Sequence, residues 1–394
     1  MKITILTSSY PLYRGDYAGI FVEKMALPLA TWGHKVDVVA PGHPEAPRHE
    51  NHANLQVWRF PYFLRAFEQL AYGPGGIPEN LRSSRLMALL IPFFMLGFLI
   101  AAWKRSAGAD VIHANWTLPA GWVARLVGKR RGVPYVLTAR GSDIQLAKKS
   151  SLAGRLCRPV LMDAALVTTV SEALREEVIA MGVPPGRVRV IPSGVAVKTT
   201  RPRGQDRPEL PRPRGVFVGS LRELKGVDVL IEAMAKLRDR GTLHSLWIVG
   251  DGPEREKLED LVRKLRLTDR IAFTGRVPHD EVGSWMAEAD YMVLPSFSEG
   301  RPNVVYEAFA VGTPVVATNI PGTSELIADG ERGLLVPVKD SAALAEAMEK
   351  VGGNEVLSQH LAEMGSAWLA AQGLTWDACA RSYLAAYEAA VPAS

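Results

Sequence analysis

Two glutamates in the second half of the chain, Glu299 and Glu307, have the spacing that most suggests chemistry. We expect a strand to end near Pro295, a loop to follow, and a helix to begin around Asn303. The free amides and the dipole of such a helix start favour an anion, typically a phosphate. Gly300 lets the backbone approach a ligand closely. Carboxylates beside a phosphate repel it, so their natural partners are sugar or ribose hydroxyls; the alternative is two solvated acids.

The residues around this pair resemble family 4 of the retaining glycosyltransferases, which have the α/β GT-B fold of two Rossmann-like, doubly wound domains facing across a cleft. The resemblance rests on Glu299, seven intervening residues and Glu307, with Gly300, Asn303 and the following run Ala-x-Gly-x-Pro-Val-Val. Weaker matches occur in the family's order along nearly the whole chain. They begin at Gly19, Gly33, Asp110, Phe217, Val249 and Phe273.

The resemblance implies a nucleotide-sugar donor site in the second half. Glu299 would contact the donor sugar, Glu307 the nucleotide ribose, and Lys225 the diphosphate, whose charge must be stabilised as it leaves. The alternative for Lys225 is a solvated turn residue. The backbone from Gly300 to Val304 would hold the sugar and the distal phosphate. The other candidate donor-binding residues are Arg301, Pro302, Asn303, Arg222, Ser220, Gly219, Gly250 and Arg276.

One donor-site position departs from the family pattern. Relatives often have an arginine directly after Gly219, where this chain has Ser220. Arg222 could supply the missing charge from another direction, or it could be an ordinary surface arginine.

The resemblance places the acceptor in the first half. The loop that contains Gly15 and Gly19 would approach the transferred sugar and the acceptor, unless its role is structural. The chain has no G-x-G-x-x-G run after a strand, which argues against a dinucleotide site. Arg140 stands where many relatives have a histidine. An arginine cannot shuttle a proton, but it could bind a phosphate or an acidic sugar.

Three further residues complete the candidate site of the first half. His113 ends a predicted strand and could face the ligand or be a hydrogen-bonded core histidine. Asn115 stands where relatives often have a second histidine, and Asp143 could orient Arg140 or cap the next helix. The candidate catalytic set is Glu299, Lys225, Arg140 and His113.

The implied reaction is retaining transfer of a sugar from a nucleotide-sugar, with a UDP-sugar as the first expectation, to a hydroxyl of a saccharide or lipid-linked saccharide. In the family the leaving diphosphate is thought to draw the acceptor proton, so no carboxylate nucleophile is required. The chain has no Asp-x-Asp pair to hold a divalent ion. We therefore expect no metal and no cofactor. The rivals are a sugar-nucleotide epimerase and a noncatalytic sugar-nucleotide binder; a Rossmann dehydrogenase would need the missing glycine fingerprint.

Strand and helix patterns alternate along the chain, which predicts parallel sheets covered on both faces. We expect an N-terminal acceptor domain over 1–195, a linker rich in proline and arginine over 196–215, a donor domain over 216–375, and a terminal helix over 376–394 that packs back on the N-terminal domain. The expected strands are 3–7, 36–40, 56–60, 111–114, 135–138, 166–169, 188–191, 216–219, 246–250, 271–274, 291–295, 314–318 and 333–337.

The composition is that of a soluble globular protein. The 394 residues are 47% hydrophobic and 22% charged, which suggests two domains, or three, and excludes disordered, collagen-like and all-membrane chains. The N-terminal apolar run is too short for a secretory signal, and Cys157 and Cys379 cannot form a disulfide framework. We expect a cytoplasmic protein of unknown oligomeric state.

The charge is divided unevenly between the halves. Residues 1–200 hold 24 Lys+Arg and 13 Asp+Glu, a net of +11, and the rest of the +5 chain has a net of −6. The basic half could meet an anionic partner, or the two domains could attract each other. Nucleic acid is disfavoured because no DNA-binding motif occurs.

An uncharged segment over 86–103 ends at Lys104 and Arg105. Its length is at the limit of a transmembrane helix. Because it lies between two strands of one predicted sheet, we favour a buried or membrane-dipping helix over a span. With the Lys129–Arg131 cluster it suggests peripheral attachment to the inner face of an anionic membrane, and an acceptor that is a lipid-linked saccharide or a growing polysaccharide.

Overall fold

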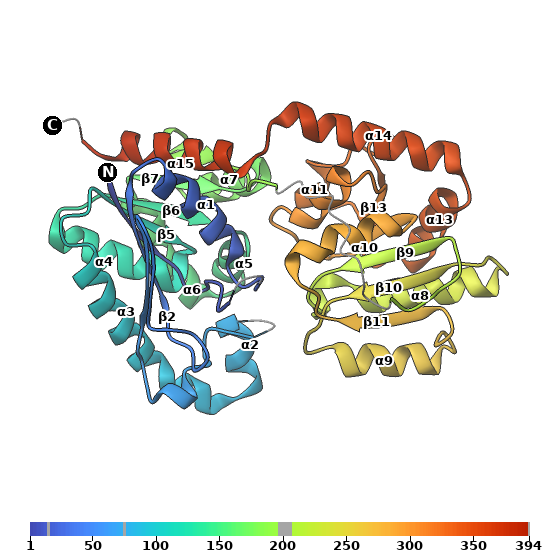
Figure 1. The fold of residues 1–394 in the computed structure, drawn as a ribbon, viewed down its shortest axis with the longest axis horizontal. Coiled ribbons are helices and arrows are strands. Elements are labelled where there is room, and N and C mark those ends of the chain that lie inside the picture. Colours follow the sequence, from blue (N-terminus) through green and yellow to red (C-terminus); the bar gives the residue numbers. More distant parts are fainter. Residues whose placement is uncertain (14–15, 74–75, 196–206, 393–394) are drawn as a thin grey trace. The chain divides into compact units, whose positions relative to one another are not determined.

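Two compact α/β units make up the chain. The structure is a computed structural model and describes residues 1–13, 16–73, 76–195 and 207–392. Residues 1–194 and 375–394 form the first unit, and residues 195–374 form the second (Figure 1). Each unit is built around a sheet with helices on both faces, which confirms the predicted fold class.

The strands of the first sheet follow the order β3-β4-β2-β1-β5-β6-β7-β8. Their bounds are β1 (Lys2–Leu6), β2 (Lys35–Pro41), β3 (His49–His52), β4 (Leu55–Phe60), β5 (Val111–Asn115), β6 (Tyr135–Ala139), β7 (Leu166–Thr169) and β8 (Val188–Val190). The strands from β4 to β8 pair in parallel, while β3 pairs antiparallel with β4 at the edge. The sequence did not predict β3, because its polar and mostly exposed residues show no apolar alternation.

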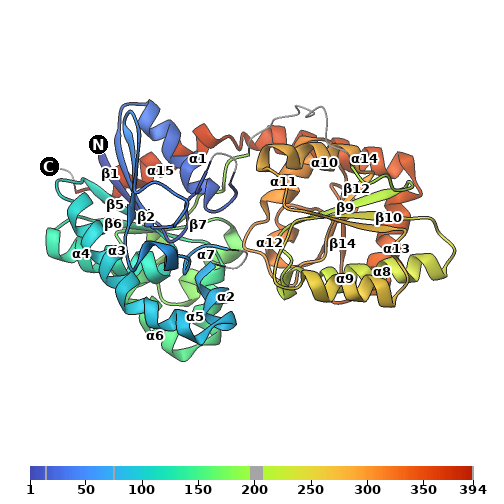
Figure 2. The same cartoon turned by 60° about the horizontal axis from the view of Figure 1, so that its bottom comes forward.

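Helices cover both faces of the first sheet (Figure 2). They are α1 (Ile20–Thr31), α2 (Gly76–Ser83), α3 (Ile91–Arg105), α4 (Trp122–Arg131), α5 (Ser142–Lys149), α6 (Ser151–Asp163), α7 (Glu172–Ala180) and α15 (Trp376–Ala390). One core layer packs α1 and α15 against the sheet, and the other packs α3, α4 and α6 against the opposite face.

The second sheet has the strand order β11-β10-β9-β12-β13-β14, and its neighbours pair in parallel. The strands are β9 (Arg214–Val218), β10 (Ser245–Val249), β11 (Ile271–Gly275), β12 (Tyr291–Leu294), β13 (Val315–Thr318) and β14 (Leu334–Val336). The order reverses between β9 and β12, as in a Rossmann fold, and ligands bind beyond the carboxyl ends of the strands at such a point.

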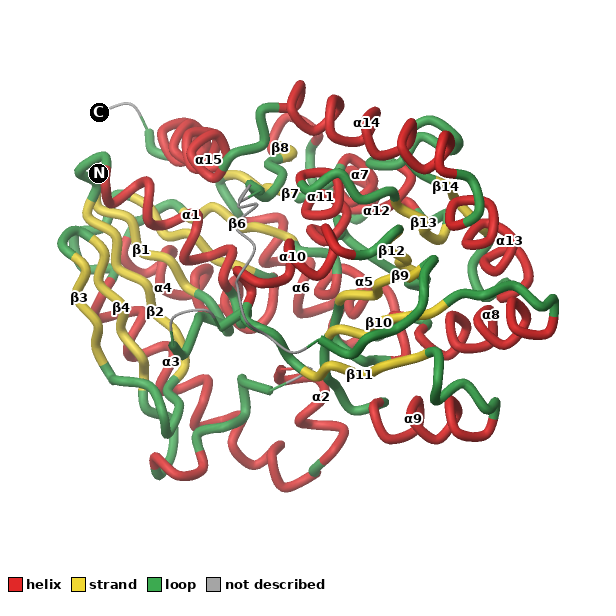
Figure 3. Tube along the Cα trace, turned by 45° about the vertical axis from the view of Figure 1, so that its right-hand side comes forward, coloured by secondary structure: helices red, strands yellow, loops and turns green. Residues whose placement is uncertain are grey.

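The helices of the second unit are also divided between two faces (Figures 2 and 3). They are α8 (Val227–Asp239), α9 (Arg255–Lys264), α10 (Val282–Glu288), α11 (Asn303–Ala310), α12 (Pro321–Ser324), α13 (Ser341–Gly352) and α14 (Glu355–Gln372). Buried side chains of α8, α9 and α13 form one core layer, and those of α10 and α11 form the other.

The predicted linker over 196–215 overlaps the second unit at its carboxyl end. Residues 196–206 lie outside the described residues, but 207–213 pack on the second unit and β9 begins at Arg214. The Trp247 Nε1 donates to the Pro208 carbonyl at 3.0 Å, and the Arg207 guanidinium lies 4.4 Å above the Trp285 ring. The prolines and arginines that suggested a linker therefore also make contacts within the second unit: the Pro208 carbonyl accepts a hydrogen bond, and Arg207 makes a cation–π contact.

The terminal helix α15 belongs to the first unit. Tyr383 and Tyr387 are buried in the core layer that also contains α1. Gly194, where the chain leaves this unit, lies against the start of α15, since a Cβ there would be 2.5 Å from the Trp376 nitrogen. The close approach explains a glycine at this position.

The apolar segment over 86–103 forms a 3₁₀ turn, η2 (Arg85–Leu90), followed by α3. Within the described residues, the stretch Leu86–Arg105 is long and apolar enough to cross a membrane by length and composition alone, with a mean hydropathy of 2.4. However, α3 buries Phe94, Phe98 and Ala102 in the core of the first unit. A span would have to remove these side chains from that core, so the fold favours a helix that stays with the sheet.

Candidate functional site

The carboxyl ends of the central strands of the second sheet carry closely packed glycines. Gly219 follows β9 and Gly250 follows β10. The φ of Gly250 is +141°, and a Cβ there would lie 1.9 Å from the Gly219 carbonyl oxygen. Side chains are therefore excluded where these two loops meet, and the backbone is exposed to a ligand. Arg276 follows β11 at the same edge and is exposed.

Lys225 and Glu299 meet at this edge. The Lys225 Nζ donates to the Glu299 Oε1 at 2.5 Å, and the Ser296 hydroxyl donates to the same oxygen at 2.6 Å. The side chains of Lys225 and Glu299 are 25% and 12% exposed. The pair is thus held in place but open to a ligand.

The fold brings these two residues together through one glycine. Lys225 ends the 3₁₀ turn η5 (Glu223–Lys225), and Gly226 follows with a φ of +62°. A Cβ on Gly226 would lie 2.3 Å from the Pro295 carbonyl oxygen, so only glycine allows the two loops to touch. A backbone hydrogen bond of 2.8 Å from the Phe297 nitrogen to the Leu224 carbonyl fixes the contact.

Helix α11 begins at Asn303, next to this pair in sequence, as the spacing predicted. Its first amides have no acceptor within the helix and carry the positive end of the dipole. Glu307 lies one turn into the helix and is partly buried. Burial raises the pKa of its carboxyl to about 7, and no charge or hydrogen bond from the described residues offsets that rise. Hydrogen bonds from ligand hydroxyls would stabilise the ionised form of such a buried carboxyl.

The remaining candidate donor residues have different surroundings. Arg301 faces inward: its Nε donates to the Tyr306 hydroxyl, and its Nη1 lies 3.4 Å from Glu325. Pro302 is buried as the N-cap of α11, while Gly300, Val304 and Ser220 are partly buried. Arg222 is partly buried, and its backbone carbonyl accepts from the Lys225 amide at 2.9 Å. This contact does not decide between a donor-binding and an ordinary surface role for the Arg222 side chain.

In the first unit, Arg140 and Asn115 lie together at the ends of β6 and β5. The Arg140 Nη2 donates to the Asn115 Oδ1 at 2.8 Å, and the guanidinium lies 3.9 Å above the Phe21 ring. The Asn115 Nδ2 and the Arg140 Nε are buried and have no hydrogen-bond partner among the described residues. Unpartnered buried donors are costly. Asn115 is fully buried, whereas Arg140 is only partly buried, so its guanidinium is the group of this pair that a ligand with acceptor oxygens can reach.

Asp143 binds backbone amides rather than the Arg140 guanidinium. Its Oδ1 accepts from the amides of Arg140 and Gly141, both at 3.1 Å, and its Oδ2 accepts from the Thr117 amide at 2.9 Å. It therefore ties the loop after β5 to the loop after β6 and positions Arg140 through the backbone. The sequence had offered two roles for Asp143, orienting Arg140 or capping the next helix, and neither included this link between two loops. Trp116, beside Thr117, has a φ of +68°, and such backbone strain is concentrated at functional sites.

The structure corrects the expectation that His113 reaches a ligand. His113 is fully buried in β5. One ring nitrogen bonds to the Thr138 hydroxyl at 2.7 Å and the other to the Tyr387 hydroxyl at 2.8 Å. Burial and the nearby Arg140 lower its pKa to about 3, so the ring is neutral. The alternative of a hydrogen-bonded core histidine is the right one, because β5 is central and covered on both faces.

The glycine loop of the first unit is described only in part, since Gly15 lies outside the described residues. Gly19 has a φ of +65° and is the N-cap of α1. A Cβ on Gly19 would lie 2.2 Å from the Ser9 carbonyl oxygen. Its conformation and packing are sufficient to require glycine, which supports the structural alternative.

Comparisons with known proteins match both units. The description "Glycosyl transferase 4-like domain" matches residues 18–194, and "Glycosyl transferases group 1" matches residues 212–354. A D-inositol 3-phosphate glycosyltransferase of Acidothermus cellulolyticus is 32% identical over 375 residues, which are 86% of this chain and 78% of the relative. The chain belongs to the family 4 glycosyltransferases.

Other matches to this glycosyltransferase extend over almost its full length. TuaC of Bacillus subtilis (strain 168), a glycosyltransferase named for teichuronic acid biosynthesis, is 28% identical over 92% of both chains. Sucrose-phosphate synthase from Thermosynechococcus elongatus has a TM-score of 0.81 with 26% identity and 98% coverage of each chain. HepE of Anabaena, solved with UDP and glucose, has a TM-score of 0.74 at 18% identity, covering 98% of this chain and 99% of its own, and shares the fold. The fold is therefore GT-B.

Two residues that contact the candidate site carried no sequence signal. Ser296 holds Glu299, and Phe21 supports Arg140 through its ring face. A serine three residues before a glutamate and an aromatic near a helix start are both common. Only the structure shows these contacts, one within the loop after β12 and the other between α1 and the loop after β6.

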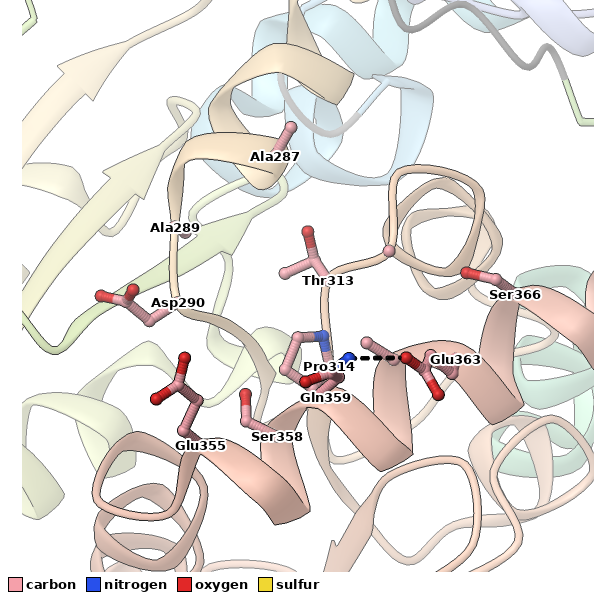
Figure 4. Close-up of a pocket in the computed structure, with 12 residues that line it drawn as sticks. Ala287, Ala289, Asp290, Thr313, Pro314, Glu355, Ser358, Gln359, Glu363 and Ser366 are labelled. Carbon is pink, nitrogen blue, oxygen red and sulfur yellow. Dashed lines mark hydrogen bonds between the residues drawn. The ribbon is translucent and has the colours of Figure 1, made fainter.

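A groove elsewhere in the second unit is distinct from the candidate site around Lys225 and Glu299. It has a volume of about 580 Å³ and is lined by Asp290, Pro314, Glu355, Gln359 and Glu363 among others (Figure 4). Asp290 and Pro314 precede β12 and β13, so the groove lies at the amino ends of the strands, whereas Glu299 follows a carboxyl end. The groove includes none of the predicted site residues.

If His113 is a core residue, Tyr387→Phe should lower the stability of this glycosyltransferase without removing its activity. Loss of the hydroxyl leaves a buried ring nitrogen unpaired, which costs about 1–3 kcal/mol of unfolding free energy. Urea titration measures the loss. The matched control is Tyr383→Phe, which removes a hydroxyl bonded to Thr138 at 3.2 Å but leaves both ring nitrogens of His113 with their partners. A fall in kcat with unchanged stability would contradict the core role.

Proposed function

We propose that this glycosyltransferase transfers a sugar from a UDP-sugar to a hydroxyl of a saccharide or lipid-linked saccharide, with retention of the anomeric configuration. The observation that carries the proposal is the Lys225–Glu299 pair, which lies between the backbone glycines after β9 and the start of α11. A cation, the amino end of a helix and two carboxylates match the diphosphate and the hydroxyls of a nucleotide-sugar.

In the proposed reaction, the bond between the anomeric carbon and the diphosphate oxygen breaks while the acceptor oxygen bonds to that carbon on the same face. The acceptor proton passes to the departing diphosphate, so charge and atoms balance without a protein nucleophile. Lys225 and the α11 amides stabilise the charge on the leaving group. Glu307 accepts the ribose hydroxyls, and Glu299 accepts hydroxyls of the sugar. The proposed reaction uses no divalent cation.

For the first unit we propose a role on the sugar and acceptor side. The partly exposed Arg140 guanidinium, held by Asn115, is suited to a carboxylate, a phosphate or hydroxyl oxygens. The relative named for teichuronic acid biosynthesis and the basic charge of residues 1–200 support polysaccharide biosynthesis at the cytoplasmic face of a membrane.

The proposal predicts selective donor stabilisation. In a thermal-shift panel in EDTA, one of the UDP-, GDP- and ADP-sugars should raise the Tm of the wild type, and we expect a UDP-sugar. The shift should be lost in both Glu307→Ala and Lys225→Ala. Transfer in EDTA, with the product anomer determined by NMR, should show retention.

Turnover of a UDP-sugar without any acceptor would instead indicate an epimerase. Binding without turnover on any saccharide would indicate a noncatalytic binder. Activity that disappears in EDTA and returns with Mn²⁺ would contradict the metal-free chemistry.

A further inference from the structure

Exposed apolar side chains from two segments of the first unit gather on one surface, which we call the apolar face. The first segment contributes Phe63, Leu64 and Phe67, and the second contributes Leu86, Leu89, Phe93, Leu96, Ile100 and Trp103. The two segments touch, because the Phe63 ring lies 6.1 Å from Phe67 and 5.8 Å from Phe93. The sequence had singled out only the second segment.

Helix α3 is apolar on two opposite sides. Phe94, Phe98 and Ala102 are buried in the core, whereas Phe93 and Leu96 are 51% and 57% exposed. Ile100 and Trp103 continue the exposed side at helical spacing. Burial against the sheet explains the first side. The second side contacts Phe63 and Arg131 at its edge and stays largely exposed. Contiguous exposed apolar residues of this kind mark an interaction surface.

The sequence around the apolar face is basic throughout. Residues 61–67, 84–108 and 122–132 contain no aspartate or glutamate. Lys104 is exposed on the last turn of α3, and Lys129 and Arg130 are exposed on α4, which packs beside α3 (Figure 1). Arg65 is exposed between Phe63 and Phe67. Asp163 pairs with Lys129 at 2.6 Å. The exposed Arg65, Lys104 and Arg130 nevertheless give the apolar face a predominantly basic rim.

We propose that the apolar face binds an anionic lipid bilayer, with α3 lying in the interface rather than crossing it. Aromatic and leucine side chains enter the boundary between headgroups and acyl chains, while lysine and arginine contact anionic headgroups. Each basic residue near such a surface adds electrostatic attraction, and burial of apolar side chains strengthens binding further. The inference deepens the proposed function, since it places the enzyme beside a lipid-linked acceptor.

The basic residues around the apolar face favour an anionic bilayer over a second copy of this chain as its partner. A twofold interface would place the same surface on both subunits, so the basic rim of one would face the basic rim of the other. An anionic membrane neutralises that rim, whereas a dimer would concentrate it.

The test is co-sedimentation of the full chain with vesicles of phosphatidylcholine and phosphatidylglycerol, or of phosphatidylcholine alone, at low salt. We expect the wild type to bind the anionic vesicles, and Phe93→Ser/Leu96→Ser to reduce the partition coefficient by at least about tenfold. The matched control is Leu243→Ser/Val356→Ser, because these residues are 54% and 81% exposed on the second unit. Lys104→Gln/Arg130→Gln should weaken binding, and Lys264→Gln/Lys350→Gln should not.

A second readout locates the contact. Trp103 lies on the apolar face, so brominated lipids should quench part of the wild-type fluorescence, and Trp103→Phe should lose that part. Equal binding by the wild type and the apolar-face variant would overturn the proposal. Concentration-dependent dimers that ignore vesicles would also overturn it. Transfer to a water-soluble acceptor should be unchanged in every variant, so a failed transfer assay would count against the proposed function and not against membrane binding.

Discussion

Replacing Lys225 by alanine is expected to lower kcat by about 10²–10³-fold, because one preorganised cation aimed at a developing negative charge has an effect of that size. Lys225 contacts Glu299 at 2.5 Å and is positioned by the turn before Gly226. Its removal deletes the charge and leaves Glu299 with the Ser296 hydroxyl alone among its described partners. A steady-state transfer assay, with Tm as a check on folding, measures the effect.

Two further variants separate charge from structure. Lys225→Arg should retain part of kcat, because the charge stays while its geometry changes. Lys257→Ala, which removes an exposed lysine paired with Glu254, should be neutral. A double-mutant cycle with Glu299→Gln should be strongly non-additive if the pair acts as a unit. If Lys225→Ala keeps kcat within about threefold of the wild type, the electrostatic role is wrong.

Replacing Glu307 by glutamine is expected to stabilise the free protein at pH 8 while weakening donor binding. The folded-state pKa of Glu307 is about 7, above its ordinary value of 4.5. Stability is therefore lost as pH rises from 4.5 through 7, because the unfolded chain ionises first and the folded carboxyl must ionise while buried. At pH 8 the full cost is about 3 kcal/mol. Glutamine avoids it, so Tm should rise by roughly 5–10 °C at pH 8 and hardly at all near pH 4.5.

Donor binding should change in the opposite direction. The ionised carboxyl accepts hydroxyl donors more strongly than the amide, so Glu307→Gln should raise the Kd for UDP-glucose by about 10–100-fold at pH 8. Wild-type binding should tighten as pH rises through 7, and binding by the variant should be independent of pH. Glu256→Gln, an exposed glutamate on α9, is the control. A pH-dependent Kd that persists in Glu307→Gln would assign the titration to another group.

The candidate site of the second unit could be located from the sequence because its residues lie in one short stretch. Glu299, Asn303 and Glu307 span a strand end, a loop and a helix start, and each carries a local signal. The first half was less predictable. His113 and Asn115 lie two residues apart on β5, yet one is bonded to Tyr387 and the other to Arg140. The two side chains lie on the same side of the strand. Their different partners follow from the distant segments that cover each position, α15 over His113 and the loop after β6 beside Asn115, and no local pattern identifies those segments.

Contacts with distant segments also explain why the sequence did not predict the surroundings of the segment 86–103, of Asp143 and of Arg301. The apolar pattern over 86–103 indicated a helix. It could not show that one side of this helix is buried in the core while the other is exposed. Asp143 has the type of a helix cap, whereas its partners include the Thr117 amide from a different loop. Arg301 follows the family motif, but Tyr306 and Glu325 hold its guanidinium.

The route of the chain has a consequence for synthesis. The chain leaves the first unit at residue 194 and returns at residue 375 to add α15. About 200 residues must be translated in between, which takes roughly 10–40 s at ordinary rates. Throughout this interval the apolar side of α1, with Val22 and Met25, has no Tyr383 or Tyr387 to cover it. A nascent or C-terminally truncated chain should therefore depend on chaperones and aggregate readily, and a tag fused after residue 392 is safer than any shortening of α15.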